Sequence, residues 1–69
     1  MKVRQLIFVV EKDPERGYNA RAIGHSIITQ ADTVKEMKEM IREAVKCHFD
    51  PGERPFKILV RFPRKTILL

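Results

Sequence analysis

Cysteine is almost absent from this sequence of 69 residues, and Cys47 is its single example. One cysteine excludes a disulfide within the chain, and no Cys-x-x-Cys pair or Cys/His-rich run predicts a structural zinc site. Long apolar runs are missing as well: the longest, residues 6–10, is far below the roughly 20 residues that span a bilayer. The first residues lack the apolar core of a signal peptide. These absences predict a cytoplasmic protein with no membrane segment.

The short length limits how well the chain can stabilise itself. Residues 1–69 are predicted to form one domain, which at this size buries only about 60% of the surface of the extended chain. A core this small usually gains stability from disulfides, from a metal or from association with other copies. Because the sequence predicts neither a disulfide nor a metal site, we expect a homo-oligomer, either a dimer or a tetramer.

Negative charge is scarce in the last part of the chain. The whole sequence carries 14 Lys and Arg against 9 Asp and Glu, a formal net charge of +5. Residues 51–69 contain five basic residues and one acidic residue, Glu53, so most of the surplus lies there. A local excess of this kind attracts nucleic acid or an acidic protein surface. Lys and Arg that keep a strand edge solvated would explain the same excess.

The hydrophobic spacing predicts the α+β class with the order β-β-β-α-β. Runs of β-branched and large apolar residues, bounded by Pro and Gly, are typical of strands joined by turns. One run instead shows the spacing of three and four that is typical of a helix. The expected architecture is one helix packed on one face of a small sheet. The expected strands are residues 3–10, 18–23, 26–29 and 56–62, and the expected helix is residues 34–48.

The helix has the clearest signals. Thr33 and Glu36 match a capping box, in which each side chain accepts a hydrogen bond from the backbone N–H of the other residue. An Asp-Pro-Gly sequence at residues 50–52 ends the helix. Met40 and Cys47 are expected to widen its apolar stripe. The stripe consists of Val34, Met37, Ile41, Ala44, Val45 and His48.

The first strand is apolar on both sides, although one helix covers only one face of a sheet. The uncovered side, together with Leu59 of the last strand, should therefore form an exposed apolar patch. Such a patch marks an interface with a second copy or with another protein. We predict this interface role for Leu6, Phe8, Val10 and Leu59.

Two segments, GYNARA (residues 17–22) and QADTVKE (residues 30–36), resemble the HicB-like antitoxin family, and the resemblance covers residues 1–62. It implies a partial RNase H-like fold with the same β-β-β-α-β order. It also implies that the protein binds a small mRNA-cleaving, HicA-like toxin and covers its RNA-binding or catalytic surface. Many members add a C-terminal DNA-binding module. No helix-turn-helix or ribbon-helix-helix segment follows the last strand here, so the resemblance implies a solo antitoxin domain.

No group of residues predicts catalysis or a resident metal. Cys47 and His48 are adjacent on the helix and point about 100° apart, so they do not easily share one ligand. We expect a buried thiol, an imidazole that interacts with the last helical carbonyls, and His25 in a turn. The carboxylates do not converge as two-metal chemistry requires, and the common phosphate-loop, serine-nucleophile and zinc-protease motifs are missing. The expected protein is not an enzyme and carries no cofactor.

A small nucleic-acid-binding module is the alternative function. The net charge supports it, because an antitoxin for a basic toxin is usually acidic. Lys57 and Arg61 share one face of the last strand, and the resemblance places the first strand beside it. We nevertheless favour the interpretation that these cations only keep the strand surface solvated, because interleaved aromatic residues and a recognition helix are missing. The complete basic set is Lys2, Arg4, Lys57, Arg61, Arg64 and Lys65.

Overall fold

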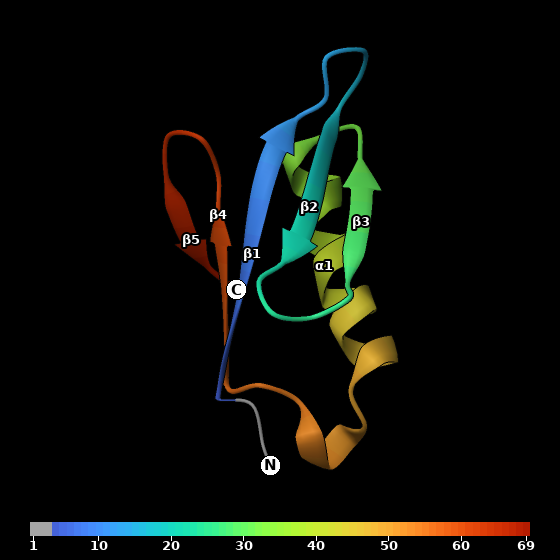
Figure 1. Ribbon diagram of the computed structural model, residues 1–69, viewed down its shortest axis with the longest axis vertical. Helices are drawn as coiled ribbons and strands as arrows, with labels where there is room; N and C mark the ends of the chain where they lie inside the picture. Colours follow the sequence, from blue (N-terminus) through green and yellow to red (C-terminus); the bar gives the residue numbers. More distant parts are fainter. Residues whose placement is uncertain (1–3) are drawn as a thin grey trace.

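The computed structural model describes residues 4–69 and shows a five-stranded sheet with one helix packed on it (Figure 1). The predicted α+β class and β-β-β-α-β order are confirmed, and the structure adds a fifth strand. The predicted strand start at Val3 lies outside the described residues. The elements are β1 (Gln5–Lys12), β2 (Tyr18–Ala22), β3 (Ile28–Ala31), α1 (Val34–His48), the 3₁₀ helix η1 (Pro51–Glu53), β4 (Lys57–Arg61) and β5 (Thr66–Leu68).

The strand order in the sheet is β3-β2-β1-β4-β5. β1 and β4 are parallel neighbours, because α1 and η1 carry the chain back across the sheet between β3 and β4. The other neighbouring strands are antiparallel. Figure 1 shows α1 behind β2 and β3; the opposite side of the sheet is named the open face below. No helix in residues 4–69 is long and apolar enough to cross a membrane.

The sequence pattern does not predict β5. Pro63 ends β4 as expected, but the amide of Phe62 then donates to the carbonyl of Lys65 (N···O 2.7 Å) and closes a turn. This turn lets β5 pair with β4, so β5 is the edge strand. β3 also begins two residues later than predicted, because the Ala22 amide donates to the Ile27 carbonyl (3.0 Å) and lengthens the turn before it.

α1 has the predicted bounds. The Thr33 hydroxyl accepts a hydrogen bond from the Glu36 amide (3.1 Å), which confirms the Thr33 half of the predicted capping box. At the other end, the amide of Phe49 donates to the Val45 carbonyl (3.0 Å) and completes the last turn. The short polar segment at residues 50–52 then turns the chain toward β4.

The buried stripe of α1 is narrower than predicted. Met37, Ile41 and Val45 are buried, which confirms its centre. Met40 is 46% exposed and Cys47 is exposed, so the expected widening of the stripe and the buried thiol are both wrong. The cause is the position of the helix, which packs mainly on β3 and β2 and leaves its flanks to solvent.

The core lies between α1 and one side of the central strands. Leu6, Phe8 and Val10 are only 1%, 0% and 2% exposed. The prediction that these three side chains form an exposed patch is therefore wrong. They are among the largest fully buried side chains, and a partner could reach them only if the domain unfolded.

The register between β1 and β2 explains which side of β1 is buried. Phe8 lies opposite Ala22, and Val9 lies opposite Arg21. An alanine leaves room for a large ring under the helix, whereas a guanidinium has to remain in solvent. The side of β1 that shares a face with Arg21 is therefore the open one.

Candidate functional site

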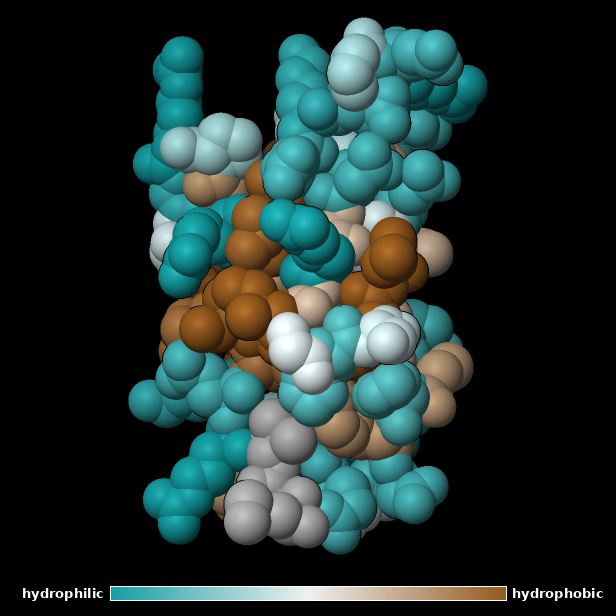
Figure 2. All heavy atoms as spheres, viewed as in Figure 1, coloured by the Kyte–Doolittle hydropathy of each residue, from teal (hydrophilic) through white to brown (hydrophobic). Residues whose placement is uncertain are grey.

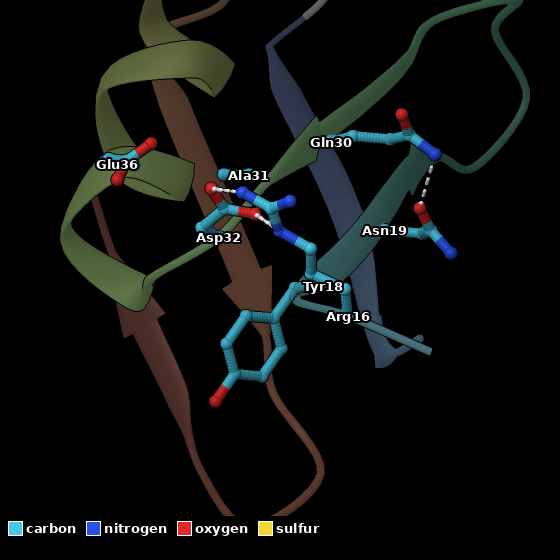
Figure 3. Close-up of a pocket in the computed structure, with 7 residues that line it drawn as sticks. All are labelled: Arg16, Tyr18, Asn19, Gln30, Ala31, Asp32 and Glu36. Carbon is cyan, nitrogen blue, oxygen red and sulfur yellow. Dashed lines mark hydrogen bonds and ion pairs between the residues drawn. The ribbon is translucent and has the colours of Figure 1, made fainter. Parts of the chain in front are cut away.

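Polar side chains connect the β1–β2 turn with β3. Asp13 Oδ1 accepts hydrogen bonds from the amides of Glu15 (2.9 Å) and Arg16 (3.3 Å). Asp13 Oδ2 accepts one from Asn19 Nδ2 (2.9 Å). Gln30 Nε2 on β3 donates to Asn19 Oδ1 (2.9 Å), as the dashed line in Figure 3 shows. This series of bonds holds the turn in one shape and ties it to the edge of the sheet.

These bonds lower the pKa of the Asp13 carboxyl below its ordinary value of 3.8, chiefly through the Glu15 amide and then through Asn19. With a lowered folded-state pKa, the charged carboxylate stabilises the turn above the unfolded-state value, and this contribution is lost as pH falls through the folded-state pKa. An NMR titration of the side-chain carboxyl should give a pKa below 3.8. Asn19→Ala should raise that pKa, and a wild-type value at or above the ordinary one would contradict the observed bonds.

Arg16 and Asp32 form a second link between the β1–β2 turn and the β3–α1 loop. The guanidinium is bidentate, with Nε to Oδ1 at 3.1 Å and Nη2 to Oδ2 at 3.0 Å. Asp32 raises the pKa of Arg16 through this hydrogen bond and through its charge. Both side chains are exposed, so the pair fixes geometry more than it adds stability.

A polar pocket of about 310 Å³ lies around this link (Figure 3). The ring of Tyr18 points away from Asn19 and Gln30 in this view. The two segments that resemble the HicB-like antitoxin family, residues 17–22 and 30–36, meet here. They are joined by strand pairing and by the hydrogen bond between Gln30 and Asn19. The structure thus gives these segments a folding role. The lining residues are Arg16, Tyr18, Asn19, Gln30, Ala31, Asp32 and Glu36.

The two histidine rings contact each other, but in residues 4–69 no third side chain joins them to make a metal site. The ring centroids of His25 and His48 are 6.2 Å apart, and both rings meet Phe49, at 5.6 and 4.9 Å. Cys47 is exposed on the neighbouring position of α1. Within residues 4–69, no three His, Cys, Asp or Glu side chains are placed to hold a metal ion.

The open face carries an apolar band across the sheet. Ile7 on β1 lies opposite Leu59 on β4, which lies opposite Leu68 on β5. Leu68 is 63% exposed, and Ile28 on the edge strand β3 is 79% exposed. Figure 2 shows two groups of hydrophobic residues at mid-height on this face, with hydrophilic residues between them and toward the two ends. The apolar band comprises Ile7, Val9, Ile28, Leu59 and Leu68.

Cations lie within the apolar band as well as beside it: Arg21 separates Val9 from Ile28. In register, Val9 lies between Arg21 of β2 and Arg61 of β4, and Lys57 begins β4 on the same face. Arg21 is 3.9 Å from Glu11, a long and exposed contact. The open face therefore presents aliphatic side chains interspersed with cations, which suits a binding surface more than a reaction site.

The predicted site residues do not form one surface. Leu59 lies on the open face, in contrast to the other three residues of the predicted interface. Lys57 and Arg61 share this face, as their alternation predicts. Arg64 and Lys65 instead lie in the turn between β4 and β5. The remaining two members of the basic set are Arg4, exposed just before β1, and Lys2, which is outside the described residues.

Comparison with known proteins gives two close relatives. No protein-family model and no solved structure matches this sequence. A UPF0150 protein of Archaeoglobus fulgidus is 56% identical over 54 residues, covering 78% of this chain and 80% of the relative. A UPF0150 protein of Thermotoga maritima is 43% identical over 65 residues, covering 94% and 91%. Identity at this level over most of both chains shows that the protein belongs to the UPF0150 family.

Proposed function

We propose that this protein is a solo HicB-like antitoxin domain that binds another protein through the apolar band. The observation that carries the proposal is the exposure of aliphatic side chains on the open face, above all Ile28 and Leu68. Leu68 continues the row of Ile7 and Leu59, whereas Ile28 lies on β3 beyond Arg21. An exposed apolar surface of this kind typically marks an interface. The antitoxin role itself rests on the resemblance of residues 17–22 and 30–36, with which membership of UPF0150 is compatible.

The partner would be a small mRNA-cleaving toxin of the HicA type. Arg21, Lys57 and Arg61 lie among the side chains of the band. They favour a docking surface that carries carboxylates, because complementary charge steers association and like charge opposes it. A basic RNA-binding surface would be repelled by the same three cations. We therefore expect this antitoxin to hold its toxin by an acidic surface beside the RNA-binding one.

Without the toxin, a second copy of the chain is expected to cover the band. A domain of this size gains from hiding apolar surface, and a two-fold arrangement would place the same band on both sides of the interface. Self-association and toxin binding would then compete for Ile7 and Leu59. The toxin complex should accordingly contain fewer copies of the antitoxin per assembly than the free protein does.

Leu59→Glu should abolish both associations, because it places a carboxylate in the middle of the band. Light scattering at high micromolar concentration should show a dimer or larger for the wild type and a monomer for the variant. Co-purification with a HicA-like toxin encoded by a neighbouring gene should weaken by at least about tenfold, since burial of one leucine contributes roughly 1.5–3 kcal/mol.

Two further variants separate loss of binding from loss of folding. Ile28→Glu changes a side chain that is 79% exposed, so it should weaken binding and leave the circular dichroism spectrum unchanged. Met40→Glu adds the same charge to an exposed residue of α1, away from the open face, and should leave both associations intact. A folded Leu59→Glu protein that still associates would overturn the proposal, as would an equal effect of Met40→Glu.

A further inference from the structure

A cleft lies between the ends of the two hairpins, on the helix side of the sheet. Its volume is about 440 Å³, within the range of roughly 300–1,000 Å³ that small-molecule sites occupy. Figure 2 shows the hairpin ends as two separate hydrophilic projections with a gap between them. The cleft is distinct from the apolar band, because it opens beside the start of α1. The lining residues are Lys12, Tyr18, Val34, Phe62, Pro63, Arg64 and Lys65.

The lining of this cleft combines cations with an apolar floor. Lys12 comes from β1, whereas Arg64 and Lys65 come from the β4–β5 turn, and no carboxylate lines the cleft. In the part of the chain that the structure describes, the ion pairs involve other cations, so these three have no carboxylate within 4.0 Å. Tyr18 and the mostly buried Phe62 line it with aromatic side chains. The cleft therefore suits an anion that carries a flat, apolar body.

We propose that this cleft binds one nucleotide of a single-stranded nucleic acid. The base packs against Tyr18, whose ring points away from Asn19 and Gln30 in Figure 3, and the flanking phosphates contact Lys12, Arg64 and Lys65. Three cations suit a ligand with several phosphates better than a ligand with a single carboxylate. An aromatic ring beside the cations provides the stacking surface that single-strand binders use. Because the cleft is open, the strand can continue past it on both sides.

This inference is independent of the proposed antitoxin role, since the two surfaces lie on opposite faces of the sheet. It shares Arg64 and Lys65 with the basic set expected from the sequence, but Lys57 and Arg61 of that set lie on the open face, outside the cleft. An inorganic phosphate would leave the apolar floor uncovered, and an acidic peptide would lack a ring for Tyr18. These two ligands, together with a free mononucleotide, therefore serve as competitors in the test.

Fluorescence anisotropy with a labelled oligouridylate of about ten nucleotides tests the proposal. The wild type should bind it with a dissociation constant that is micromolar or lower in about 0.1 M salt. Arg64→Gln with Lys65→Gln should reduce the slope of log affinity against log salt by about 1.4, because each single-strand phosphate contact contributes about 0.7. Arg42→Gln with Lys46→Gln removes the same two charges from the exposed side of α1 and should change the slope much less. Equal slopes for the two double variants would overturn the site.

Tyr18 gives the second arm of the test. Tyr18→Phe keeps a ring and should bind like the wild type, whereas Tyr18→Leu keeps apolar volume without a stacking surface and should lose about 5- to 100-fold in affinity. The Leu59→Glu protein should bind the oligonucleotide normally, so failure of this proposal is distinguishable from failure of the antitoxin proposal. Inorganic phosphate, uridine monophosphate or an oligoglutamate that competes as well as the oligonucleotide, at equal concentration, would overturn the assignment to a strand.

Discussion

Phe8→Ala should remove about 3–5 kcal/mol from the free energy of unfolding, as truncation of a fully buried phenylalanine typically does. Phe8 has no exposed surface and lies under α1, opposite Ala22 of β2 and Val60 of β4. Its neighbours are held by the sheet, so they cannot move in to fill the space that the ring leaves. A domain of this length has a total stability of only about 3–10 kcal/mol, so a large fraction of the variant should be unfolded under ordinary conditions.

Urea unfolding followed by circular dichroism measures this effect. Ile28→Ala is the matched control, because it also truncates a large apolar strand residue but on the exposed edge of the open face. At a protein concentration low enough for the wild type to be monomeric, the control should change the free energy of unfolding by no more than about 0.5 kcal/mol. Similar losses for the two variants would mean that Ile28 is buried as Phe8 is, and a larger loss for Ile28→Ala would mean that the helix covers the other face of the sheet.

The face of β1 that lies under the helix could not be read from β1 itself. Its residues alternate, but both sets are apolar, so the spacing is equally compatible with either face. The deciding information lies in β2, where Ala20 and Ala22 alternate with Arg21. Once the turn at residues 13–17 sets the register, Arg21 places Val9 on the solvent side and Phe8 in the core. The buried face of β1 is therefore predictable only when the register between β1 and β2 is considered.

Elements with strong local signals were predictable. The helix bounds follow from the Thr33 cap and the polar stop at residues 50–52, and both act within a few residues of the helix end. β5 has no such local signal, since it is three residues long and forms only because the turn around Pro63 returns the chain to β4. The cleft could not be predicted from the sequence for a similar reason. Lys12 and Arg64 are far apart in the chain, and only the order of the strands in the sheet brings their hairpins together.

Gly17→Ala should lower the free energy of unfolding by about 2–4 kcal/mol, which combines the strain of a left-handed backbone with that of overpacking. Gly17 has φ +66°, a conformation that other residues rarely adopt. A Cβ at this position would lie 2.5 Å from the carbonyl oxygen of Ala31, and backbone atoms cannot move aside as a flexible side chain can. The hairpin end would have to lift off the β3–α1 loop, which would also separate Arg16 from Asp32.

The other two glycines divide this effect into its parts. Gly24 also has a positive φ, +80°, but a Cβ there would meet nothing within 4 Å, so Gly24→Ala should show the backbone strain alone, about 1–2 kcal/mol. Gly52 has neither feature, and Gly52→Ala should be neutral or stabilise by up to about 1 kcal/mol, since it restricts the unfolded chain. Thermal unfolding of the three variants should therefore rank Gly17→Ala lowest, by roughly 4–8 °C for each kcal/mol of difference. If Gly17→Ala and Gly24→Ala unfolded at the same temperature, the close contact between Gly17 and Ala31 would add nothing to the loss of stability.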